Sequence, residues 1–376
     1  MTNRENFISI GRRKGYEYMP VNLILCPSLK EKYQTYLLEH DLNLPIGEGY
    51  IKDLPFTCQS EEYFLKNIYK NKNFKPGTRI DKWGVAHEPG SAAAYHMTYM
   101  HNPMKDFDSV EQIESYPLPV FHNEGLEEQI KAVKAFHDED RAVVGSMQCT
   151  IWETAWYMRG MENLMCDMMS DDPMATVLLD RVTEIAIQRA VSFAKAGADG
   201  IFLGDDVGMQ HTIMMSESLY DEWLKPRLKR VIDAARAVNP DILIFYHSCG
   251  HITELIPYLI EAGVDVLNPV QPECMDFREI HDRFGDRLSF HGTIGTQTTM
   301  PYGTPEEVRR KVFEHLDIAG KKGGLYVCPT HILEPEVPIE NVVAYIQACI
   351  DYPGTANIPE VSSVIPFINV LKERLQ

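Results

Sequence analysis

Short apolar runs alternate with longer segments of helical period along the second half of the chain. The runs are rich in β-branched residues and contain few polar positions, a pattern typical of parallel strands that are buried on both faces. The predicted strands are Ala142–Met147, Gly200–Gly204, Ile242–Tyr246, Val264–Asn268, Leu288–Phe290 and Leu325–Val327. Six successive β-then-α units require right-handed parallel crossovers, so the pattern predicts either a doubly wound sheet or a closed (β/α)8 barrel.

The segments between these runs carry signals for helix starts and ends. Asp172-Pro173 predicts an N-cap followed by the first helical residue, and Gly197 predicts the end of the same helix. Residues 304–307, Thr-Pro-Glu-Glu, predict a capping box with proline in the first turn. These signals place helices between the predicted strands, as a barrel requires.

The first third of the chain has a less regular pattern. Val21–Leu25 is expected to form a seventh strand, followed by a helix over Leu29–Leu38, and the eighth strand is expected between Tyr50 and Met104. No linker, repeat or low-complexity tract divides the chain. We therefore predict an α/β fold with one (β/α)8 TIM-barrel domain over residues 1–376, in which residues 1–140 form an elaborated N-terminal region with the first strands and residues 141–350 form clear βα units.

Composition and charge exclude several classes of protein. Hydrophobic residues make up 44% of the chain and charged residues 24%, which is ordinary for a globular enzyme. The 36 Lys and Arg residues against 54 Asp and Glu residues give a net charge of −18, which argues against binding to nucleic acid. The sequence shows no apolar leader and no run of about 18 apolar residues, so we expect a cytoplasmic protein without a membrane span. Its eight scattered cysteines are expected to be reduced thiols or ligands.

Polar residues follow the predicted strands at their carboxyl ends. In (β/α)8 barrels these ends, with the loops after them, form the active site. The residues concerned are Gln148, Cys149 and Glu153; Asp205 and Asp206; His247 to His251; Gln271; His291; and Cys328 to His331. The recurrence of polar groups at these ends predicts a functional site there.

His247 and Cys249, with Cys328 at a later strand end, form the sharpest candidate for a metal site. Side chains at i and i+2 of an extended segment point to the same side, so His247 and Cys249 can bind one ion together. One imidazole and two thiolates suit Zn²⁺, and three protein ligands leave an open fourth position, as in catalytic zinc sites. A buried thiol beside a structural histidine is the alternative that the pattern leaves open.

Glu153, Asp205, Asp206 and His291 are the candidates for catalytic work at the same edge. Glu153 could be a fourth metal ligand or a proton carrier. Asp205 or Asp206 could orient the substrate, accept a proton or approach the metal, and one of them could instead cap the following helix or turn. His291 could be a proton donor or a hydrogen-bonded histidine of the core.

Four stretches of the sequence resemble the uroporphyrinogen decarboxylase superfamily, whose members are (β/α)8 barrels. The stretches are Gly204–Gln210, His247–Gly250, Pro301–Val308 and Pro338–Val342. The resemblance covers residues 140–350 well and the first third poorly. True uroporphyrinogen decarboxylases carry an N-terminal Met-Arg-Gln-Ala-Gly-Arg-Tyr motif whose arginines hold the substrate carboxylates. That motif is missing from this sequence, so porphyrin decarboxylation is not expected.

Another branch of this superfamily, the zinc-dependent methyltransferases linked to corrinoids, has a pattern that this sequence resembles more. Its signature of His-x-Cys and a cysteine far downstream maps onto His247, Cys249 and Cys328. The resemblance implies that these residues bind zinc. It also implies that cobalamin is carried by a partner corrinoid protein, because the chain lacks an Asp-x-His-x-x-Gly corrinoid-binding signature. Dimers are common in the superfamily, so a homodimer is a further expectation.

The resemblance implies two chemistries, which the ligands alone do not separate. The aromatic- and Met-rich segments before residue 170 favour a planar substrate, so we expect a methyltransferase of the O-demethylase type. It would move a methyl group from a small methylated substrate, an aryl methyl ether, to the Co(I) of the corrinoid protein, with zinc as a Lewis acid. The alternative is a methylcobamide:thiol methyltransferase of the coenzyme M type, in which zinc presents a thiolate. A decarboxylase for another acid and a non-catalytic binding barrel are further alternatives.

Overall fold

A parallel sheet lies at the centre of the fold. Among residues 1–40, 49–90 and 98–352, which the computed structural model describes, this sheet has seven strands in the order β1-β7-β8-β9-β10-β11-β12. The strands are β1 (Gly49–Ile51), β7 (Val143–Gln148), β8 (Gly200–Gly204), β9 (Leu243–His247), β10 (Val266–Asn268), β11 (Ser289–His291) and β12 (Leu325–Tyr326). Consecutive strands from β7 onward are neighbours, so each connection is a parallel crossover and the predicted α/β architecture is confirmed.

The six strands predicted in the second half of the chain are all present, within two residues of their predicted ends. β1 pairs with β7 and lies at the start of the interval expected for the eighth strand. The prediction of a strand over Val21–Leu25 is wrong, because within this segment only Leu25 forms a β-bridge, with Leu333. Prolines at positions 20 and 27 flank the segment and cannot donate hydrogen bonds to a neighbouring strand, which limits a longer ladder.

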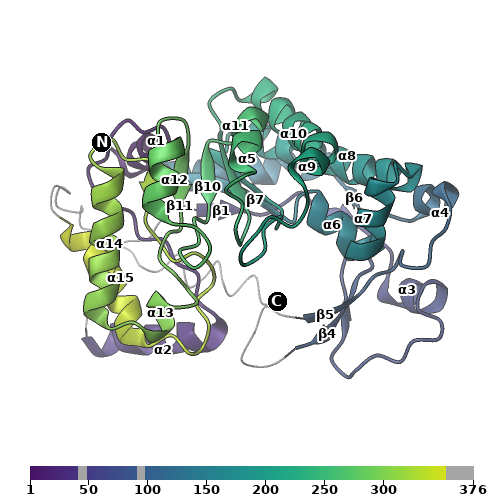
Figure 1. Ribbon diagram of the computed structural model, residues 1–376, viewed down its shortest axis with the longest axis horizontal. Coiled ribbons are helices and arrows are strands. Elements are labelled where there is room, and N and C mark those ends of the chain that lie inside the picture. The colour runs from purple at the N-terminus through teal and green to yellow at the C-terminus, as the bar shows by residue number, and fades with distance from the viewer. Residues whose placement is uncertain (41–48, 91–97, 353–376) are drawn as a thin grey trace.

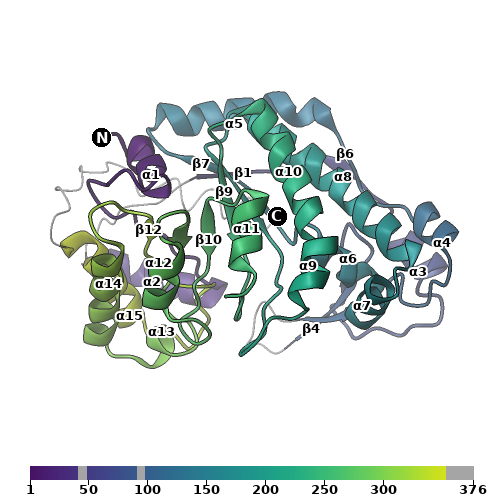
Figure 2. The ribbon, with the colours of Figure 1, turned by 45° about the horizontal axis from the view of Figure 1, so that its top comes forward.

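Helices cover the outer face of the sheet (Figures 1 and 2). They include α8 (Pro173–Ala196), α9 (Glu217–Trp223), α10 (Lys225–Val238), α11 (Ile256–Ala262), α12 (Phe277–Phe284), α13 (Thr299–Tyr302), α14 (Pro305–Ala319) and α15 (Ile339–Asp351). The predicted caps are confirmed: the Asp172 side chain accepts a hydrogen bond at the start of α8, Gly197 ends it with φ 85°, and Thr304 forms a capping box. Of the described helices, none is long and apolar enough to cross a membrane.

The N-terminal region adds short elements around the sheet. They are α2 (Pro27–His40), β2 (Phe56–Thr57), α3 (Glu61–Asn67), β3 (Arg79–Ile80), β4 (Ala86–Pro89), β5 (Thr98–His101), α4 (Val110–Ser115), β6 (Val120–Phe121) and α5 (Leu126–Asp138). Figure 1 shows β4, β5 and α3 on the same side of the molecule as α6 (Trp152–Arg159) and α7 (Met161–Met169). Helix α2 lies at the opposite side, beside α15.

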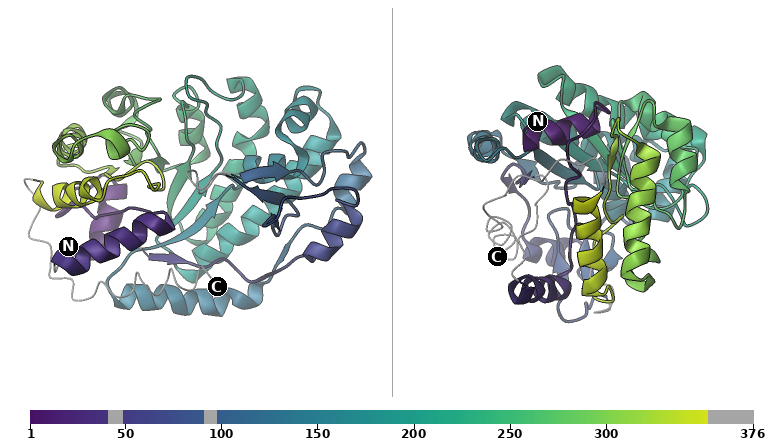
Figure 3. Two further views of the ribbon diagram at one scale, coloured as in Figure 1. Left: turned by 90° about the horizontal axis from the view of Figure 1, so that it is seen from below. Right: turned by 90° about the vertical axis from the view of Figure 1, so that its left-hand side faces the viewer.

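Helix α1 (Asn3–Gly11) packs against the amino-terminal ends of the strands (Figure 3). The ring centroid of Phe7 lies 4.8 Å from that of Tyr326, and the Tyr326 hydroxyl donates a hydrogen bond to the Phe7 carbonyl oxygen at 2.6 Å. Deeper in the sheet interior, the rings of Phe202 and Phe245 stack with centroids 5.4 Å apart. Apolar side chains therefore fill this end of the interior, and the polar residues lie at the carboxyl ends of the strands.

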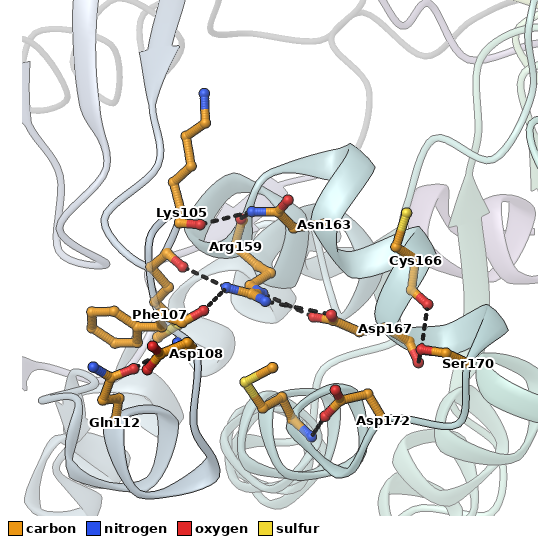
Figure 4. A network of polar contacts seen from close by, with 12 residues as sticks. Lys105, Phe107, Asp108, Gln112, Arg159, Asn163, Cys166, Asp167, Ser170 and Asp172 are labelled. Atoms are coloured by element: carbon orange, nitrogen blue, oxygen red, sulfur yellow. Dashed lines mark hydrogen bonds and ion pairs between the residues drawn. The ribbon is translucent and has the colours of Figure 1, made fainter.

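The buried Arg159 side chain on α6 pairs with Asp167 on α7 and binds the N-terminal region through two carbonyl oxygens (Figure 4). Arg159 Nε donates to Asp167 Oδ2 at 2.8 Å, and Arg159 Nη1 donates to the carbonyl oxygens of Met104 and Phe107 at 2.9 and 2.8 Å. Both charged side chains are almost inaccessible to solvent. This contact fixes the segment between β5 and α4 against α6, whose first turn belongs to the candidate site.

Candidate metal centre

His247, Cys249 and His331 lie together at the carboxyl ends of the strands. One possible ligand atom from each side chain lies within 4.8 Å of the other two. His247 is the last residue of β9, and its Nε2 lies 3.4 Å from Cys249 Sγ. His331 follows β12, and its ring centroid lies 6.1 Å from that of His247. Two imidazoles and one thiol form a candidate metal site whose donor atoms suit zinc.

Cys328, the third ligand in the predicted set, does not belong to this group. It is buried, and its Sγ lies 3.4 Å from Nδ1 of His291. Beyond β12 the chain continues beside β11, since the Cys328 carbonyl accepts hydrogen bonds from the backbone of Thr293 and Ile294. This path keeps Cys328 in the layer of His291 and brings His331 to the group instead. The sequence signal for His331 was its place in the strand-end run Cys328–His331.

The orientation of His247 suits it to metal binding through Nε2. Its Nδ1 lies 2.5 Å from Oδ1 of Asn268, so Nδ1–H donates and Nε2 is left unprotonated toward Cys249. Asp206 Oδ1 accepts a hydrogen bond from the Cys249 backbone N–H at 2.7 Å and lies 3.6 Å from His247 Nε2. Asp206 therefore fixes the backbone of one candidate ligand and places negative charge beside another.

The Cys249 thiol is surrounded by groups that disfavour its ionisation. Burial raises its pKa well above the usual range, and the carboxylates of Asp206 and Glu153 raise it further. A cation bound by Cys249 would reverse this effect because the thiolate is the metal-binding form. Metal binding is therefore expected to release a proton from Cys249.

Glu153 and Tyr157 form a hydrogen-bonded pair on α6 next to this group. The Tyr157 hydroxyl donates to Glu153 Oε1 at 2.6 Å, and the Asp206 backbone N–H donates to Glu153 Oε2 at 3.1 Å. Burial, and then the nearby Asp206, raise the pKa of the Glu153 carboxyl. A carboxyl with a raised pKa at such a site is suited to proton transfer. Tyr157 is a site residue that the sequence patterns did not indicate, although its i+4 spacing from Glu153 was visible.

Asp205 has a different place from its neighbour Asp206. Its carboxylate is buried and accepts hydrogen bonds from the backbone N–H groups of Ile151 and Glu153, at 3.1 and 2.9 Å. These donors belong to the first turn of α6, which has no partner for them within the helix. The geometry therefore favours the capping role for Asp205 rather than a role in chemistry.

Replacing Asp205 with Ala is expected to lower the free energy of unfolding by about 2–4 kcal/mol, because two buried N–H groups lose their acceptor. Urea unfolding measures this change. The matched control is Asp206→Ala, whose side chain is 39% exposed and which should cost less. Equal unfolding midpoints for the two variants would contradict the capping role.

His291 lies one layer below the candidate ligands. Burial, and then His247, lower its pKa to about 3, so the ring is neutral near pH 7. Asn268 Nδ2 donates to its Nδ1 at 2.7 Å, and its ring stands edge-on to those of Phe202 and Phe245. These contacts favour the hydrogen-bonded core histidine over the proton donor.

The sequence is similar to a known protein family and to several of its characterised relatives. A family model described as Uroporphyrinogen decarboxylase (URO-D) matches residues 93–352. Methylated-thiol–coenzyme M methyltransferase from Methanosarcina mazei is 28% identical over 203 residues, which are 53% of this chain and 50% of that protein. Uroporphyrinogen decarboxylase from Carboxydothermus hydrogenoformans is 28% identical over 167 residues, 44% of each chain. This chain thus spans about half the length of the curated relatives it matches.

The fold also has a solved counterpart. A structure described as a methyltransferase from Methanosarcina mazei superposes with a TM-score of 0.60 and covers 93% of this chain and 98% of its own. The two sequences are 16% identical over the match, so the likeness concerns the fold alone. It confirms the predicted barrel class.

Proposed function

The chain belongs to the uroporphyrinogen decarboxylase (URO-D) family, and on that premise we propose that it is a zinc-dependent methyltransferase. It transfers a methyl group between the sulfur of a small thiol and a corrinoid carried by a partner protein. The grouping of His247, Cys249 and His331 is the observation that carries this proposal. Similarity to methylated-thiol–coenzyme M methyltransferase supports sulfur as the reacting atom. The relatives give no support to an aryl methyl ether, so a thiol replaces it as the proposed substrate.

The residues fit a zinc ion by the chemistry of their donor atoms. Imidazole and thiolate are the usual zinc ligands, and Asn268 leaves His247 Nε2 unprotonated for this purpose. Three protein ligands leave one position for the substrate. Zinc bound there would lower the pKa of a thiol in that position and so favour the thiolate form.

Glu153 is the proposed acceptor for the proton that the substrate thiol loses. Its carboxylate is buried, and its raised pKa makes it a stronger proton acceptor than an exposed carboxylate. Tyr157 and the Asp206 backbone each hold one of its oxygens, so its orientation is fixed before substrate arrives. Asp206 holds the backbone of Cys249 in place, and Asp205 holds the first turn of α6.

A panel of methyl donors and acceptors tests the proposed reaction. The zinc-loaded protein is mixed with methylcobalamin and a series of thiols that includes coenzyme M, and loss of the methyl-Co(III) absorbance is followed. In the reverse direction, Co(I) cobalamin is offered methylated thiols or aryl methyl ethers. We expect turnover with thiols and methylated thiols, and much slower or no turnover with ethers. Turnover with ethers alone, or with neither class, would overturn the proposal.

Zinc affinity is expected to rise with pH. Because the pKa of Cys249 is raised, its thiol is protonated at pH 6–8 in the metal-free protein, and zinc must displace that proton. Each displaced proton makes the association constant rise by about tenfold per pH unit. Competition with a chelator of known pH dependence measures the slope. A constant affinity between pH 6 and 8 would show that no thiol is deprotonated on binding.

A further inference from the structure

Asn268 lies between two histidines at the end of β10. Its Oδ1 is 2.5 Å from His247 Nδ1, and its Nδ2 is 2.7 Å from His291 Nδ1 and 2.9 Å from the His291 carbonyl oxygen. Asn268 is the register partner of His247 in the β9–β10 pairing, which brings the two side chains to neighbouring positions. Its side chain is buried.

The surroundings of Asn268 permit one orientation of its amide. The reverse orientation would place Oδ1 against the His291 carbonyl oxygen, and two acceptors cannot share a hydrogen bond. Oδ1 therefore faces His247 and accepts the proton of Nδ1. This selects the tautomer of His247 in which Nε2 has a free lone pair.

His291 holds Asn268 in turn. The His291 ring is neutral, since burial lowers its pKa to about 3, and its Nδ1 accepts from Asn268 Nδ2. The stacked rings of Phe202 and Phe245 lie beneath it, with their centroids 5.6 and 6.0 Å from that of His291. The amide of Asn268 is therefore held by a buried, packed histidine and not by solvent.

We propose that Asn268, supported by His291, is a positioning residue that fixes the tautomer and ring orientation of His247 for metal binding. This inference rests on the proposed metal site. In it, His291 orients Asn268, and Asn268 at the end of β10 orients the ligand His247. An acceptor hydrogen-bonded to the second ring nitrogen orients an imidazole ligand, and its removal typically lowers metal affinity by about 10- to 100-fold.

The test compares three variants in two measurements. Asn268→Leu removes all three hydrogen bonds of the side chain. Asn268→Asp keeps the acceptor toward His247 but replaces the donor toward His291 with an oxygen, and Asn341→Leu is the control. Asn341 is also buried, and its Nδ2 likewise donates two hydrogen bonds, to the carbonyl oxygens of Met300 and Gly303. Zinc affinity is measured by chelator competition. The tautomer of His247 in the metal-free protein is measured from its imidazole ¹⁵N shifts.

We expect the wild-type protein to show the Nδ1–H tautomer of His247. Asn268→Leu should lose that preference and bind zinc about 10- to 100-fold more weakly. Asn268→Asp should keep the tautomer, because it keeps the acceptor toward His247, and Asn341→Leu should keep both properties. An unchanged tautomer in Asn268→Leu, or Nε2–H in the wild type, would overturn the inference. Failure of the wild type to bind zinc would instead overturn the proposed function, and the tautomer of metal-free Asn268→Asp would still decide the role of Asn268 should the Leu variant not fold.

Discussion

Replacing Cys249 or His331 with Ala is expected to abolish stoichiometric zinc binding, whereas Cys328→Ala is expected to retain it. Structural zinc sites bind with about 10–16 kcal/mol shared among four ligands, so loss of one ligand should weaken binding by about 10²- to 10³-fold. Cys328 lies against His291 and outside the ligand group, so its thiol is not required. Elemental analysis after dialysis, followed by chelator competition, measures these differences.

Cys328→Ala is also the matched control for this experiment, because it removes a buried cysteine from the same edge of the sheet. Circular dichroism and thermal melting establish that each variant is folded. Loss of zinc from Cys328→Ala together with full retention by His331→Ala would contradict the ligand set. That outcome would restore the set that the sequence resemblance implied.

Replacing Arg159 with Met is expected to lower the free energy of unfolding by about 3–5 kcal/mol. The substitution leaves Asp167 buried without its partner and leaves the carbonyls of Met104 and Phe107 without their donor. Leaving one buried charge unpaired costs more free energy of unfolding than removing a typical exposed ion pair does. Equilibrium urea unfolding of the two proteins measures the difference.

A surface ion pair provides the control for Arg159. Arg230 pairs with Glu184 at side-chain exposures of 47% and 62%, and Arg230→Met should cost less than about 1 kcal/mol. The double variant Arg159→Met, Asp167→Leu should recover part of the loss, because it removes the unpaired charge. A cost below about 1 kcal/mol for Arg159→Met alone would contradict the stabilising role of the buried Arg159 contacts.

The strands of the second half could be predicted because each is a short apolar run buried on both faces. The first third could not be read in the same way. β1 has three residues, and its pairing with β7 depends on contacts across more than ninety positions of the chain. Val21–Leu25 is apolar enough for a strand, yet within it only Leu25 forms a β-bridge, with Leu333. A proline lies on each side of the segment, at positions 20 and 27. Apolar composition alone does not determine which backbone N–H and C=O groups pair with a neighbouring strand.

The candidate site shows the same division. The i, i+2 spacing of His247 and Cys249 indicates a shared side directly from strand geometry. The third residue of the group depends on the path of the backbone after β12, which no spacing reveals, and so His331 lies where Cys328 was expected. The roles of Asp205 and Asp206 likewise separate only when the first turn of α6 is in place.

X-ray absorption at the zinc edge tests the central claim most directly. The zinc-loaded protein is measured in thiol-free buffer, so that every sulfur neighbour comes from the chain. The ligand group His247, Cys249 and His331 predicts one sulfur at about 2.3 Å and two imidazole nitrogens at about 2.0 Å. Two sulfurs and one imidazole, or a protein that holds no stoichiometric zinc, would contradict it.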